Sequence, residues 1–223
     1  MCSSDLSVHG ADALGGTINI ITRGEKPAAR AALSTGQHGL VEGFAGADFG
    51  KGMIRQSLSI WGNRSSGFMY DRDFRTFGIR SSTSLGKNTT FSFSHVDKDF
   101  GANQFYGDAP SRERTSSTLA AFDNKTSGPG GTVVSTRTYY RTHGDRFVWD
   151  LRQPEIFENR HRTHTAGTRL AVTRGLSESS SLVLGSELGG EWIRSGSLGD
   201  HRFFRSGLFA QLRVATTGDA SLT

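Results

Sequence analysis

Cysteine, proline and long apolar runs are nearly absent from this sequence of 223 residues. Cys2 is the only cysteine, which excludes a disulfide framework and a cysteine-based metal site. No stretch approaches the roughly 18 consecutive apolar residues of a membrane-spanning helix. A helical membrane protein is therefore excluded. A transmembrane β-barrel is not, because lipid-facing residues occupy only every second position of a barrel strand.

The first residues also lack the basic and apolar regions of a signal peptide. The segment MCSSDL resembles translated adapter sequence, so residues 1–6 are expected not to be native. We further expect the chain to be a fragment. In this interpretation residues 7–27 end one domain and residues 28–223 form the N-terminal portion of the next.

Glycine is abundant, with 29 residues against four prolines, and serine and threonine are frequent throughout. This composition favours many strands and tight turns over helices. The net charge is +5, but arginine and lysine alternate with acidic residues and form no basic stripe. We therefore predict no nucleic-acid partner.

Short and long connections alternate along the chain. Short turn signals recur about 35–50 residues apart, at residues 50–52, 86–88, 127–131, 175–178 and 217–219. Longer, irregular connections lie between them, at residues 64–73, 99–113, 144–162 and 196–202, with a tight one at 38–39. Transmembrane barrels place short turns at one end and long loops at the other, so this pattern favours a barrel.

The segments between these connections alternate between apolar and polar residues, which is typical of strands. Ten antiparallel strands are predicted, at residues 28–37, 40–49, 53–64, 74–85, 88–98, 114–125, 132–143, 163–174, 181–195 and 203–215. A tilted strand needs roughly 9–11 residues to cross a membrane, whereas soluble strands are commonly about 5–6 residues long. The predicted fold is therefore all-β, an antiparallel transmembrane β-barrel that is partial, with about ten strands of a larger plugged barrel.

Individual residues on these strands have predicted positions. Glu187 and Glu191 share the face opposite the leucines of their strand and are expected to line a lumen. Trp61 and Trp192 lie near strand ends and are expected at the lipid–water boundary. His164 lies three positions after His161. On a strand this odd spacing directs the two side chains to opposite faces, so no shared metal is expected.

Two other motifs resemble known binding sites. Residues 10–17 nearly match the phosphate loop G-x-x-x-x-G-K-[ST], but Gly16 replaces the lysine and a strand follows instead of a helix. Asp71 and Asp73 are spaced like calcium ligands, but the rest of a calcium-binding loop is missing. We therefore predict neither a nucleotide site nor a metal site, no cofactor, and no enzymatic activity.

The long connections are the remaining candidates for ligand binding, because functional side chains concentrate on loops that a rigid scaffold holds. Two of them, at 99–114 and 144–162, combine aromatic, acidic and arginine residues. The predicted ligand-facing residues are Tyr70, Phe105, Tyr106, Arg112, Arg146 and Trp149.

The stretch GADALGGTINIITR, residues 10–23, resembles the end of the plug domain in TonB-dependent outer-membrane receptors. In that family the pattern G-[SA]-x-A-x-x-G-x-I-N-I-x-T-[KR] closes the plug just before the first barrel strand. The ten alternating strands that follow look like the next part of the barrel. The predicted junction residues are Gly10, Asp12, Gly15, Gly16, Asn19 and Arg23.

This resemblance implies a monomeric barrel of roughly 22 strands with a plugged lumen, located in the bacterial outer membrane. It implies active uptake of a scarce ligand, such as a siderophore, haem, cobalamin or a carbohydrate. The expected partners are outer-membrane lipid, a small-molecule ligand, and the TonB energy-transducing complex, which would act through an N-terminal part missing here. Two alternatives stay open: a passive porin-like or adhesin barrel, and a soluble β-rich carbohydrate-binding module.

Overall fold

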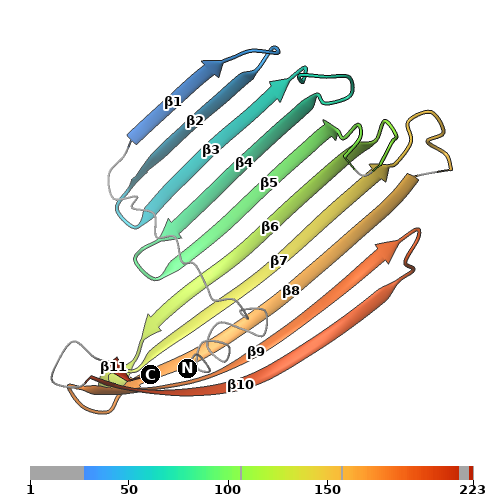
Figure 1. Ribbon diagram of the computed structural model, residues 1–223. Coiled ribbons are helices and arrows are strands. Elements are labelled where there is room, and N and C mark those ends of the chain that lie inside the picture. The colour runs from blue at the N-terminus through green and yellow to red at the C-terminus, as the bar shows by residue number, and fades with distance from the viewer. Residues whose placement is uncertain (1–27, 106, 157, 216–220, 223) are drawn as a thin grey trace.

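The computed structural model describes residues 28–105, 107–156, 158–215 and 221–222, which form a single curved antiparallel sheet (Figure 1). The predicted plug junction at residues 10–23 lies outside the described residues. The strands are β1 (Ala28–Thr35), β2 (Val41–Lys51), β3 (Ile54–Ser65), β4 (Phe74–Leu85), β5 (Thr89–Gly101), β6 (Arg112–Ser127), β7 (Val133–Val148), β8 (Glu158–Gly175), β9 (Ser180–Ser195), β10 (His201–Ala215) and β11 (Ser221–Leu222).

Each strand pairs with its neighbours in sequence, so the sheet order is the chain order. One short 3₁₀ turn, η1 (Pro129–Gly131), lies between β6 and β7. In the described part of the chain no helix is long and apolar enough to cross a membrane. The all-β antiparallel fold with ten long strands is therefore confirmed.

The connections separate by length between the two ends of the sheet (Figure 1). The β2–β3, β4–β5, β6–β7 and β8–β9 turns lie at one end, which we call the turn end. The three longest connections, β3–β4 (66–73), β5–β6 (102–105 and 107–111 described) and β7–β8 (149–156 described), gather at the other, which we call the loop end; the β1–β2 and β9–β10 connections there are no longer than the β6–β7 turn. Because antiparallel strands reverse direction at every connection, connections that alternate along the sequence lie at opposite ends of the sheet.

The two faces of the sheet differ sharply in character. Directly paired residues share a face, so the strand registers assign every side chain to one side or the other. The apolar face carries most of the large exposed hydrophobic residues of the strands; the exceptions among the described strands are Phe44, Leu119 and Phe203. The charged face carries most of the ionic side chains along the middle of the strands, among them Arg55, Arg80, Arg141, Arg169 and Glu187.

Two predicted long connections are shorter than expected. Residues 99–101 and 112–113 continue β5 and β6, and residues 144–148 and 158–162 continue β7 and β8. These extensions pair in regular register and are joined across strands by ion pairs, such as that between Arg146 and Glu158. Their charged composition suggested loops, whereas cross-strand pairing of opposite charges stabilises them as strands.

Trp61 is on the charged face, so its predicted position at the lipid boundary is wrong. Its indole ring lies across Gly78 of the neighbouring strand, where any Cβ atom would collide with it. Tyr139 covers Gly167 in the same way. These aromatic rings shield the backbone of glycines in the adjacent strand. Trp192, by contrast, is on the apolar face, as predicted.

Candidate functional site

The three longest connections pack against one another at the loop end. The amide of Asn103 donates to the carbonyl of Asp71, at 3.2 Å, which joins the β5–β6 loop to the β3–β4 loop. The amide of Leu151 donates to the carbonyl of Pro110, at 2.8 Å, which joins the β7–β8 loop to the β5–β6 loop. We refer to residues 66–73, 102–105, 107–111 and 149–156 as the loop cluster.

The loop cluster contains a small buried centre. Ser111 is only 1% exposed, and its hydroxyl donates to the Ala102 carbonyl at 2.8 Å. Ala102, Ala109 and Asp150 are buried around it. Most buried residues of the described chain lie here or next to it, because a single-layer sheet leaves both its faces open. The loops therefore form a defined surface.

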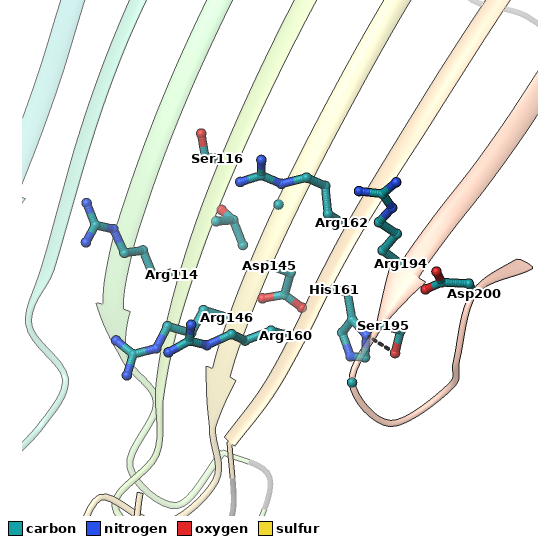
Figure 2. A pocket seen from close by; sticks show the side chains of 13 residues that line it. Arg114, Ser116, Asp145, Arg146, Arg160, His161, Arg162, Arg194, Ser195 and Asp200 are labelled. Atoms are coloured by element: carbon teal, nitrogen blue, oxygen red, sulfur yellow. Dashed lines mark hydrogen bonds between the residues drawn. The ribbon is translucent and has the colours of Figure 1, made fainter. Parts of the chain in front are cut away.

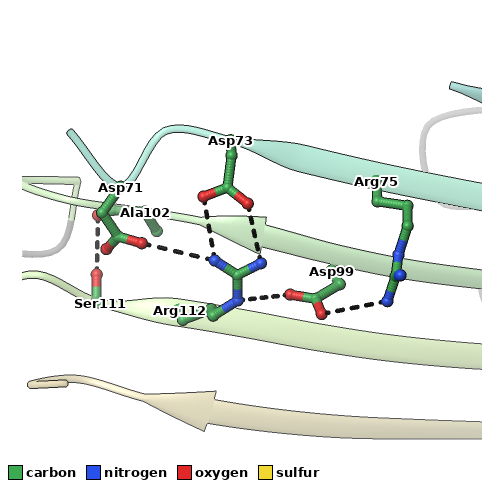
Figure 3. A network of polar contacts seen from close by, with 7 residues as sticks. All are labelled: Asp71, Asp73, Arg75, Asp99, Ala102, Ser111 and Arg112. Atoms are coloured by element: carbon green, nitrogen blue, oxygen red, sulfur yellow. Dashed lines mark hydrogen bonds and ion pairs between the residues drawn. The ribbon is translucent and has the colours of Figure 1, made fainter. Parts of the chain in front are cut away.

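One arginine ties this cluster to the strands (Figure 3). The Nη1 and Nη2 atoms of Arg112 donate to the two carboxylate oxygens of Asp73, at 3.1 and 3.0 Å. Its Nε atom donates to Asp99 at 2.7 Å, and the Asp71 carboxylate lies 3.7 Å from Nη1. Arg75 also pairs with Asp99, at 3.8 Å. Three strands and one loop therefore meet at this network.

The three loop aspartates experience different environments. Hydrogen bonds from the Arg112 guanidinium lower the pKa of Asp73. Burial raises the pKa of Asp71, although Arg112 opposes that effect. Hydrogen bonds from Arg152 lower the pKa of Asp150. Asp73 is therefore the carboxylate through which acid would weaken the attachment of the β3–β4 loop.

Acidification is expected to loosen the loop cluster through Asp73. A carboxylate whose pKa is depressed by folding contributes stability above its ordinary pKa, and this contribution is lost as the pH falls through the folded value. Amide-exchange protection at Asn103 should therefore be high at neutral pH and fall below pH 3.8, the ordinary pKa of the aspartate. In Asp73→Asn this acid-dependent step should disappear; if it persists, another group controls the cluster.

The predicted ligand-facing residues divide between loops and strands. Tyr70 and Phe105 are on the loop cluster, with 76% and 67% of their surface exposed, and Trp149 follows β7. Arg112 and Arg146 are strand residues, so their predicted place in loops is wrong. Tyr106 lies outside the described residues. The Arg72 guanidinium is 5.9 Å from the centre of the Phe105 ring, a cation–π contact that orients this exposed aromatic group.

Beneath the loops, an apolar hollow of about 380 Å³ lies at the same end of the sheet. Phe74 and Phe100 are directly paired on the charged face and line it. Phe68 and Arg72 of the β3–β4 loop and His38 of the β1–β2 turn complete its wall. The sequence does not reveal this hollow, because His38 and Phe100 are far apart in the chain and only strand pairing brings them to the same hollow.

Cross-strand ion pairs line another part of the charged face, on β8 to β10. Arg169 pairs with Glu187 at 3.1 Å, and Arg205 pairs with Glu191 at 3.1 Å. Both glutamates thus lie on the face where the sequence placed them. His161 and His164 lie on opposite faces, as expected, and no metal-binding group of three or more His, Cys, Asp or Glu residues occurs among the described residues.

No family model and no curated protein matches this sequence. Among solved structures, the chain is similar to one described as the copper transporter OprC, with a TM-score of 0.62. The two sequences are 14% identical, and the similarity covers 88% of this chain. The chain spans 36% of the length of that protein.

This similarity concerns the fold. The chain has the antiparallel strand arrangement of an outer-membrane barrel transporter. Its strands are long, one face is apolar and the other charged, and the longest connections lie at one end of the sheet. The loop cluster and the apolar hollow are both at the loop end.

Proposed function

We propose that this chain forms part of an outer-membrane barrel that imports a small ligand, as a receptor energised through TonB. The observation that carries the proposal is the division of one long-stranded sheet into an apolar and a charged face, with turns and loops at opposite ends. A soluble module has no use for a band of exposed Leu, Ile and Phe residues along one whole face.

In this proposal the edges of the sheet pair with further strands. Among the described residues, β1 pairs only with β2, and β10 pairs along its length only with β9. Unpaired backbone groups at such edges cost several kcal/mol each in lipid, so a membrane-embedded sheet closes on itself. Closure by additional strands is consistent with the 36% of the transporter's length that this chain spans.

The loop cluster and the hollow beneath it are the proposed entry site for the ligand. Tyr70, Phe105 and Trp149 offer exposed aromatic surface, and Phe74 and Phe100 continue it toward the charged face. Elsewhere on the charged face, the ion pairs of β8 to β10 offer polar groups that suit passage of a polar solute. These groups bind and guide; the proposal assigns no covalent step to them.

Energised import is supported by the resemblance of residues 10–23 to the end of a plug domain, and uptake measurements test it. Cells with and without the gene are compared for accumulated iron, copper and cobalt, supplied as ferric siderophores, haem, copper ions and cyanocobalamin, each with and without a protonophore. Gene-dependent accumulation that the protonophore abolishes supports the proposal. Accumulation that persists with the protonophore indicates a passive pore, and unchanged accumulation of all of these overturns import of metal-containing ligands.

A further inference from the structure

Five arginine side chains gather on the apolar face at the loop end (Figure 2). Arg162 of β8 and Arg194 of β9 are directly paired. In the next row toward the loops, Arg114, Arg146 and Arg160 are paired across β6, β7 and β8. All five are exposed, and they line a hollow of about 600 Å³. We call them the arginine patch.

A row of aromatic rings lies directly below the arginine patch on the same face. His164 stacks between Tyr140 and Trp192, with ring centres 6.0 and 5.6 Å apart, and the Tyr140 hydroxyl is 2.6 Å from His164 Nδ1. His164 and Trp192 each precede or follow an arginine of the patch by two residues along their strands. That spacing is roughly 5–7 Å of height on a tilted strand.

These heights match the layers of a membrane surface. Amphipathic aromatic rings collect where hydrocarbon meets water, and the polar headgroup layer beyond is about 5–7 Å thick on each side. With the aromatic row at that boundary, the guanidinium groups of Arg162 and Arg194 lie at headgroup height. Leu188 and Phe204, below the aromatic row, lie at the height of acyl chains.

The patch has unbalanced positive charge. Glu158 accepts a hydrogen bond from Arg146, at 2.9 Å, and also pairs with Arg160. In the part of the chain that the structure describes, the guanidinium groups of Arg114, Arg162 and Arg194 make no hydrogen bond or close ion pair, although Arg114 interacts electrostatically with Asp97 at longer range. Asp145 and Asp200 also line the hollow, and neither makes an ion pair with these arginines in the described residues, so the five arginines still outnumber the acidic groups.

The rest of the loop end of this face is more nearly balanced. Arg75 pairs there with Asp99, at 3.8 Å, and His95 lies 3.0 Å from Asp97. The excess of positive charge therefore lies mainly on β6 to β9, where the arginine patch surrounds one hollow, and Arg202 of β10, paired with Trp192, extends it on the same face.

We propose that the arginine patch binds the phosphate groups of an anionic glycolipid in the outer leaflet of the membrane. The ligand must match two adjacent surfaces: a cationic row above, and aromatic and aliphatic rows immediately beneath. A lipid with a phosphorylated head on acyl chains matches both, whereas a soluble anion or an acidic protein segment matches only the first. Arginine suits this role because its planar group donates two parallel hydrogen bonds to phosphate and is weakly hydrated.

This inference rests on the proposed function in one respect: it takes the apolar face to be the outer, lipid-facing side of the barrel. The test uses the full protein, purified in detergent after extraction from outer membranes. Its patch variant carries Arg114→Gln, Arg162→Gln and Arg194→Gln. The matched control carries Arg55→Gln, Arg80→Gln and Arg141→Gln, the same change of charge on the charged face. Diphosphorylated lipid A, its dephosphorylated form and inorganic phosphate are the three probes.

Unmodified protein and control are expected to bind diphosphorylated lipid A equally, and the patch variant at least about tenfold more weakly, from the loss of three headgroup-level charges. Dephosphorylated lipid A should bind all three proteins as weakly as the patch variant binds the phosphorylated form. Equal affinity of all three for diphosphorylated lipid A overturns the inference, as does equally tight binding of inorganic phosphate. Absence of the protein from outer membranes would instead contradict the proposed function.

Discussion

Replacing Leu208 by arginine is expected to destabilise the membrane-inserted protein by about 2–4 kcal/mol, the cost of a lipid-facing arginine near the bilayer midplane. Leu208 is on the apolar face of β10 and is 88% exposed, more than any other large hydrophobic residue of the described chain. In the proposed barrel its side chain would be surrounded by lipid and would have no packed protein neighbour. The charge would therefore remain in hydrocarbon unless the strand shifted.

The matched control is Gln211→Arg, three residues further along the same strand and on the charged face. In the proposed barrel the new guanidinium would face the water of the lumen there, so its effect should be small. Urea unfolding in liposomes, followed by heat-modifiable migration in gels, measures both variants. Equal stability of Leu208→Arg and Gln211→Arg would mean that the apolar face does not face lipid, and would contradict the barrel proposal.

The strands were predictable because their signal is local. Alternation in residues 181–193 placed Glu187 and Glu191 on one face and the leucines on the other, and the register confirms this assignment. The centres of all ten long strands agree with the sequence analysis. The strand ends nearest the loops extend further than the sequence predicts. Charged residues there, such as Arg146 and Arg160, are stabilised in strands because β7 and β8, on either side of a connection, pair with each other.

Most of the candidate site depends on pairings that a local pattern does not contain. Phe74 and Phe100 line one hollow because β4 and β5 align them, which fixes a contact between residues 26 positions apart. The arginine patch was missed for the same reason. Its members alternate with other residues along each strand, so no basic run is visible in the sequence, and the excess charge appears only when four strands lie side by side.

Arg112→Met is expected to release the β3–β4 loop from the sheet. The substitution keeps much of the apolar stem but leaves the carboxylates of Asp71, Asp73 and Asp99 close together without their shared cation. Removing one partner from a buried ion pair costs about 3–5 kcal/mol. Since about a third of the Arg112 side chain is exposed, water screens part of this cost, and about 2–3 kcal/mol is expected. Amide exchange at Asn103 and proteolysis within 66–73 and 102–111 should both accelerate.

Two variants separate this role from a general loss of charge. Arg152→Met removes an arginine whose side chain is 66% exposed and that pairs with Asp150 instead of with three aspartates, so a smaller effect than that of Arg112→Met is expected. Asp73→Asn in the Arg112→Met background removes one of the repelling carboxylates and should restore part of the protection, because residues of one network are coupled. If Arg112→Met and Arg152→Met have the same effect, or if Asp73→Asn gives no recovery, Arg112 does not hold the loops. In that case the buried contacts of Ser111 and Ala102 are sufficient to keep the entry site in shape.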